Sequence, residues 1–123
     1  MFCLTAGAMV ATLAVQGFTL SWVHSVQRSE IQEDYRLDGD RLVLDEARIK
    51  ESGAGFDPPP GAVLDNGWWH WRPGTLHDGL TLAQSSAPGE WRICLEQSCQ
   101  PLSYYLPESG NAAVRINACV PMP

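Results

Sequence analysis

Three residues carry side chains that could act together: His24, Glu33 and Glu46. Residues 18–26 alternate as a strand does and place His24 on the apolar face. A hairpin turning at residues 38–41 would put Glu33 directly across from Glu46. Two carboxylates and an imidazole could bind a divalent metal or perform general acid-base catalysis. Adjacent carboxylates would also not both ionise freely.

The favoured interpretation of these side chains is a structural ion network. Arg48, Arg72 or Arg92 could pair with the two glutamates, and perturbed carboxylates also occur in such structural pairs. His24 would then be a hydrogen-bonded core histidine. Ser25 points to the opposite face of a regular strand, which weakens a Ser–His nucleophile. A register slip of one residue would turn both glutamates to the solvent.

A dense aromatic run, residues 68–71, follows the tight-turn signal Asn-Gly. Trp68 and His70 should face one way, and Trp69 and Trp71 the other. One of these faces leaves an aromatic side chain exposed, so Trp68, Trp69 and Trp71 are candidates for a partner surface or a flat ligand. His70 and His77 match no metal-binding spacing and are predicted to face the solvent.

The cysteines favour an oxidising compartment. Cys94 and Cys99 are separated by four residues, too many for a redox Cys-x-x-Cys motif, and no second pair completes a zinc site. Their spacing predicts a disulfide that clamps a hairpin tip. Cys119 is left over, and Cys3 lies in the N-terminal segment described next.

Residues 1–27 contain no Asp, Glu, Lys or Arg, and Arg28 is the first of these charged residues in the chain. Residues 1–17 are apolar and rich in small residues, which predicts a signal peptide or an N-terminal membrane anchor. The stretch is short for a full membrane span. We therefore expect export to the periplasm or cell envelope, with residues 18–123 forming a single β-rich domain.

The rest of the chain reads as short alternating strands separated by turn signals. This pattern predicts an all-β fold, a compact antiparallel sandwich or barrel. Between the strands, residues 52–61 carry Gly53, Gly55 and three prolines, which cannot lie inside a sheet. We expect a loop there, and it lacks the Lys-Ser/Thr pair of a phosphate-binding loop. The net charge of −6 argues against nucleic acid as a partner.

An ordered set of motifs resembles a known bacterial family. The set comprises residues 18–26, 33–37, 42–48, 53–56 and 67–69, and the family is called domain of unknown function 1850. The similarity runs from about Phe18 to Leu102, with Tyr35 where the family would have Trp. The positions that match family motifs are His24, Ser25, Glu33, Glu46, Gly53 and Gly55.

This resemblance implies a small exported protein encoded beside TAXI-type TRAP transporters, secondary transporters that are fed by a soluble periplasmic binding protein. It supplies no catalytic residues. We therefore expect a non-enzymatic accessory that binds the membrane component, the substrate-binding protein or a small organic solute, without a cofactor. The alternatives are a stand-alone metal- or ligand-binding β-domain and, less well supported because no activated nucleophile can be identified, a hydrolase.

Overall fold

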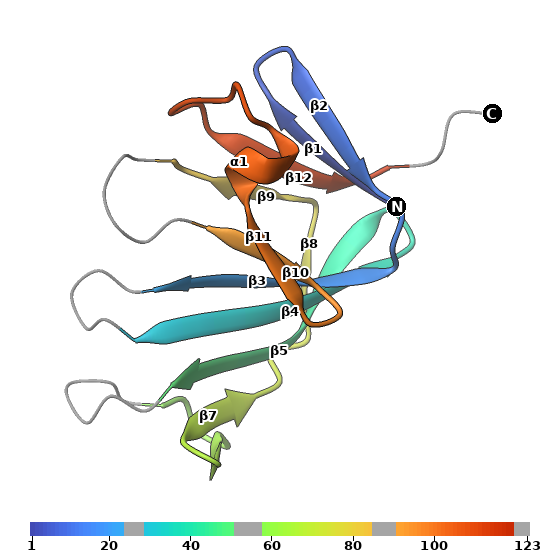
Figure 1. Cartoon of the computed structure of the whole chain (residues 1–123). Helices are drawn as coiled ribbons and strands as arrows, with labels where there is room; N and C mark the ends of the chain where they lie inside the picture. Colours follow the sequence, from blue (N-terminus) through green and yellow to red (C-terminus); the bar gives the residue numbers. More distant parts are fainter. Residues whose placement is uncertain (24–28, 51–57, 85–90, 120–123) are drawn as a thin grey trace.

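Two antiparallel sheets face each other in the computed structural model, which describes residues 1–23, 29–50, 58–84 and 91–119 (Figure 1). The smaller sheet has the strand order β2-β1-β12-β9, and the larger has the order β11-β10-β3-β4-β5-β7-β6, with β8 also paired to β5. The predicted all-β antiparallel sandwich is confirmed.

The strands of the smaller sheet come from both ends of the chain. They are β1 (Phe2–Ala6), β2 (Met9–Leu13), β9 (Leu80–Leu82) and β12 (Val114–Ala118). The strands of the larger sheet are β3 (Gly17–Val23), β4 (Glu30–Asp38), β5 (Arg41–Lys50), β6 (Val63–Asp65), β7 (Trp68–Trp71), β8 (Thr75–His77), β10 (Arg92–Leu95) and β11 (Ser98–Pro101). A single helical turn, α1 (Leu102–Tyr105), follows β11.

Tight turns join neighbouring strands where the sequence carries turn residues. Asp38 pairs with Arg41 across the β4–β5 turn, as predicted. Asn66 and Gly67 both have positive φ, 57° and 86°, the backbone of a type I′ turn between β6 and β7. Cys94 lies directly opposite Cys99 in the β10–β11 hairpin, and the predicted disulfide between them is confirmed.

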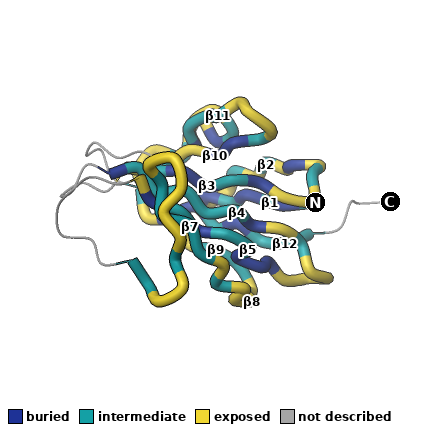
Figure 2. Tube along the Cα trace, turned by 90° about the horizontal axis from the view of Figure 1, so that it is seen from below, coloured by how far each residue is buried: buried dark blue, intermediate teal, exposed yellow. Residues whose placement is uncertain are grey.

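The core lies between the two sheets. Phe2 of β1 is fully buried and packs edge-on against Phe18 of β3, with 4.8 Å between ring centroids. Phe18 in turn stacks on Tyr35 of β4 at 5.6 Å. Burying such a side chain contributes about 2 kcal/mol. In Figure 2 the buried residues lie along the strands, whereas the turns and β8 are mostly exposed.

Residues 1–17, expected to form a signal or anchor outside the domain, are instead built into it. β1 lies between β2 and β12 of the smaller sheet, and Phe2 and Leu4 are 0% exposed. Cys3 forms a disulfide with Cys119, so neither cysteine is left over. The apolar character of this segment follows from strands that pack on the core. Among the described residues, no helix has the length and apolarity needed to cross a membrane.

A β-bulge in the β4–β5 hairpin decides which side chains share a face. Asp34 pairs with Glu46 but Tyr35 pairs with Leu44, so Asp45 has no partner in the ladder. Beyond the bulge, the alternation of β5 is reversed. Leu44 therefore points into the core, while Glu46 lies on the outer face of the larger sheet, the face turned away from the smaller sheet.

Candidate functional site

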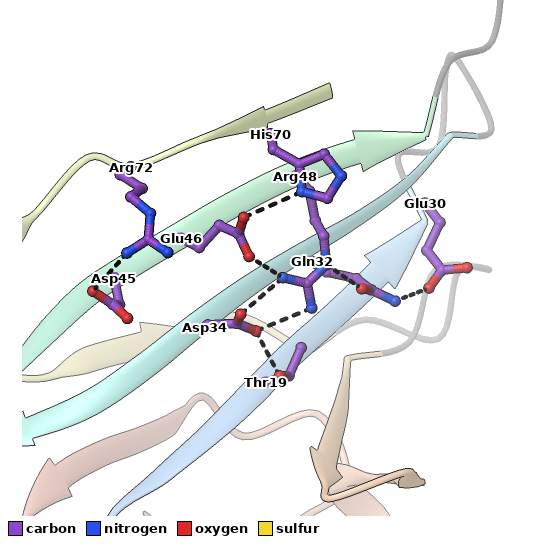
Figure 3. A network of polar contacts seen from close by, with 9 residues as sticks. All are labelled: Thr19, Glu30, Gln32, Asp34, Asp45, Glu46, Arg48, His70 and Arg72. Atoms are coloured by element: carbon purple, nitrogen blue, oxygen red, sulfur yellow. Dashed lines mark hydrogen bonds and ion pairs between the residues drawn. The ribbon is translucent and has the colours of Figure 1, made fainter. Parts of the chain in front are cut away.

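A polar network crosses the outer face of the larger sheet, with Arg48 of β5 at its centre (Figure 3). The Arg48 guanidinium donates to both carboxylate oxygens of Asp34, at 2.8 and 3.1 Å. It also donates to Glu46 Oε2 at 3.0 Å and to Gln32 Oε1 at 2.7 Å. Thr19 of β3 donates to Asp34 at 2.6 Å. The network therefore ties three adjacent strands together through side chains.

The Arg48 side chain is 18% exposed, so its charge is largely shielded from the solvent. Burial opposes the ionised form of Asp34, but hydrogen bonds from Arg48 and Thr19 outweigh it and hold the pKa of Asp34 below its ordinary value. Burial likewise works against the charged Arg48, yet Asp34 and Glu46 raise the pKa of the guanidinium. The pairing therefore favours the charged forms of both Asp34 and Arg48.

The network extends to the aromatic hairpin through His70 of β7. His70 Nδ1 lies 3.2 Å from Glu46 Oε1, because β7 pairs with β5 and sets His70 opposite Arg48. The His70 side chain is 30% exposed. His70 is therefore partly exposed on the outer face, and its contact with Glu46 was not predicted. Strand pairing over more than twenty residues of sequence brings it to Glu46, and no spacing motif signals such an encounter.

Glu33 does not join this network, so the predicted cluster of Glu33 with Glu46 does not form. The alternation of β4 puts Glu33 on the inner face with Tyr35, and the bulge in β5 sets Ala47 opposite it and turns Glu46 to the outer face. There Tyr35 Oη donates to Glu33 Oε1 at 3.1 Å. Burial raises the pKa of Glu33, opposed by the Tyr35 hydrogen bond and by His77. Burial and the neighbouring Glu33 also raise the pKa of Tyr35.

The outcome of the ion-network hypothesis is mixed. Glu46 pairs with Arg48 as favoured, but Arg72 pairs with Asp45 at 3.9 Å, and Arg92 is exposed on β10. Asp34, which accepts two hydrogen bonds from Arg48, was not predicted. The alternation of β4 could have indicated this role of Asp34, because Gln32 and Asp34 share the face opposite to Glu33 and Tyr35. His77, expected in the solvent, is half-buried and bonds to Thr75 at 2.9 Å.

Several predicted site residues lie outside the described part of the chain. These are His24, Ser25, Gly53 and Gly55. Within residues 1–23, 29–50, 58–84 and 91–119, no group of three or more His, Cys, Asp or Glu side chains could hold a metal ion. Because Glu33 and Glu46 lie on opposite faces, they cannot ligate one ion together.

A pocket of about 620 Å³ opens beside the network, where the β6–β7 hairpin lies beside Glu46 of β5. Its lining includes Glu46, His70, Trp71 and Arg72. Trp68, Trp69 and Trp71 are all half-buried, with Trp69 opposite Ile49 and Trp68 opposite Lys50. The volume lies in the range of small-molecule sites.

The family model described as domain of unknown function (DUF1850) matches residues 18–102. The chain belongs to the DUF1850 family. The match spans β3 to β11 and therefore includes both the Arg48 network and the pocket. No curated protein and no solved structure is significantly similar to this DUF1850 chain.

Proposed function

We propose that this DUF1850 protein is a non-enzymatic accessory of a TAXI-type TRAP transporter. It acts in the bacterial cell envelope by binding the membrane component or the substrate-binding protein of the transporter. Two disulfides, which use all four cysteines, support an oxidising compartment such as the periplasm. The resemblance of the ordered motifs to an exported, transporter-linked family supports the partner.

The β6–β7 hairpin is the observation that carries this proposal. It lies at the end of the larger sheet, away from the smaller sheet (Figure 1). Among the strands that the structure describes, β6 pairs only with β7, and its Val63 and Leu64 are 63% and 43% exposed. An edge strand with apolar side chains and unpaired backbone groups offers a surface to which another protein can add.

Co-purification tests this proposal. The oxidised chain is mixed with the detergent-solubilised membrane component and, separately, with the substrate-binding protein, and the retained complex is quantified. We expect one component to be captured, and Leu64→Lys to weaken capture at least about tenfold because a buried charge without a partner is costly.

Val10→Lys is the matched control, since Val10 is also apolar and 64% exposed but lies on β2 of the smaller sheet. Capture of neither component would refute the accessory role. An equal loss with Val10→Lys would refute the hairpin as the contact surface.

A stand-alone small-ligand-binding domain is the second candidate function. The pocket beside His70 and Arg72 is the observation that favours it. Ligand binding in the absence of any transporter component, together with failure of the capture experiment, would support this second function over the first.

A further inference from the structure

The pocket beside the β6–β7 hairpin combines apolar walls with an exposed arginine at its rim. Val63, Pro60, Pro73 and Trp71 supply apolar surface, and Arg72 and His70 supply nitrogen atoms. Small-molecule sites commonly have this composition, with a few polar groups that orient an otherwise apolar ligand. The question is which ligand chemistry these polar groups can accept.

Arg72 has hydrogen-bonding capacity to spare. Its side chain is 76% exposed, and its one contact within the described part of the chain is Asp45 at 3.9 Å. That separation is too long for a hydrogen bond. Asp45 is also shared with Arg36, which lies 3.7 Å away. The guanidinium can therefore donate two parallel hydrogen bonds to a carboxylate without breaking a stronger contact.

Glu46 also lines the pocket, and its negative charge is offset only in part by Arg48, which it shares with Asp34. One of its oxygens accepts from Arg48 at 3.0 Å, and the other lies 3.2 Å from His70 Nδ1. This contact fixes the orientation of the imidazole ring, and it leaves Nε2 without a partner among the described residues. In Figure 3, His70 and Arg72 lie on either side of Glu46.

We propose that this pocket binds a small organic anion with an apolar body. The ligand carboxylate accepts hydrogen bonds from Arg72. The apolar body lies against Trp71, Val63 and the two prolines. This inference rests on the proposed binding function and names the class of solute, but it concerns a surface separate from the Leu64 side chain.

Calorimetric titration of the oxidised full chain with four probes tests the proposal. Benzoate and cyclohexanecarboxylate carry both an anion and an apolar body, acetate carries only the anion, and benzyl alcohol carries only the body. We expect the first two to bind, and acetate and benzyl alcohol to bind at least about tenfold more weakly, since each lacks one set of contacts.

Arg72→Gln should weaken benzoate binding about tenfold, in line with the loss of a charge-assisted hydrogen bond. Arg41→Gln is the matched control, because Arg41 is also an exposed, ion-paired arginine of the larger sheet but does not line the pocket. Equal weakening by the two variants, or benzyl alcohol binding as tightly as benzoate, would overturn the proposal. If the chain captures a transporter component but does not bind benzoate, only this inference is overturned. If the chain binds benzoate but captures no transporter component, only the accessory role is overturned.

Discussion

Replacing Arg48 with Met should expose the energetic role of the outer-face network. The change keeps an unbranched side chain that can cover neighbouring surface, but it removes four hydrogen bonds to Asp34, Glu46 and Gln32. Asp34 and Glu46, directly opposite in the ladder, then carry like charges with no cation between them. Removing one partner of a buried ion pair costs about 3–5 kcal/mol. An exposed pair contributes less than about 1 kcal/mol, and Asp34 is 34% exposed, so we expect an intermediate loss of about 2 kcal/mol at neutral pH.

The pH dependence distinguishes lost charge pairing from lost packing. The pKa of Asp34 is lowered in the folded protein, so its stabilising contribution is present above the ordinary value of 3.8 and is lost as the pH falls through the lowered folded pKa. Arg48→Met removes that contribution and adds carboxylate repulsion, which protonation relieves. The difference in free energy of unfolding should therefore be largest near neutral pH and shrink at acidic pH.

Urea denaturation followed by tryptophan fluorescence measures this difference, provided that the m-values agree. Arg41→Met is the control, since the Arg41–Asp78 pair is 3.1 Å long but has side chains 52% and 79% exposed. We expect it to change the free energy of unfolding by less than about 0.5 kcal/mol. A loss from Arg48→Met that is equal at neutral and acidic pH would refute the electrostatic reasoning and assign the effect to packing.

Three further perturbations address the core and the termini. Glu33→Gln should raise the urea midpoint at neutral pH and leave it unchanged at acidic pH. The pKa of Glu33 is raised by burial, so ionisation of Glu33 destabilises the folded protein as the pH rises through that pKa, and glutamine does not ionise. A lower midpoint at neutral pH would contradict this. Gly79→Ala should destabilise the fold by about 1–3 kcal/mol and so lower the melting temperature, because an added Cβ would lie 2.7 Å from Arg115 Nη2 and meet the Asn117 side chain. An unchanged melting temperature would show that these two side chains move aside. Replacing Cys3 and Cys119 with serine should lower the free energy of unfolding by about 5 kcal/mol, and removing the Cys94–Cys99 disulfide should lower it by about 2 kcal/mol, because the two disulfides close loops with sequence separations of 116 and 5. Equal losses in denaturant titrations would contradict an origin in the entropy of the unfolded chain.

The features predictable from the sequence are local ones. The turns at Gly39 and Gly67 follow from residues that tolerate positive φ, and strand alternation places the neighbouring side chains. The Cys94–Cys99 disulfide follows from spacing within one hairpin. In each case the interacting residues are close in sequence, so few alternative arrangements compete. The all-β class follows from the same repeated pattern.

The candidate site was predicted only in part, because one bulge changed its membership. Counting back from the β4–β5 turn sets Glu33 opposite Glu46, but Asp45 is left unpaired and Asp34 takes the position instead. A side-chain period of two means that one extra residue exchanges the two faces of the strand. Glu46 therefore went to the outer face, where it meets Asp34, whereas Glu33 stayed on the inner face with Tyr35.

Long-range pairing was decided by the tertiary structure alone. β1 pairs with β12, and Cys3 meets Cys119, at the two ends of the described chain. Read by itself, the apolar N-terminal segment resembles a signal, because a strand buried against a core and the apolar region of a signal share the same composition. His70 reaches Glu46 only because β7 adds to β5. The sequence by itself thus determined the strands, the turns and one disulfide. The packing of distant strands decided where the N-terminal strand lies and which side chains form the polar network. Contacts between residues far apart in the sequence produce no periodic pattern from which they could be predicted.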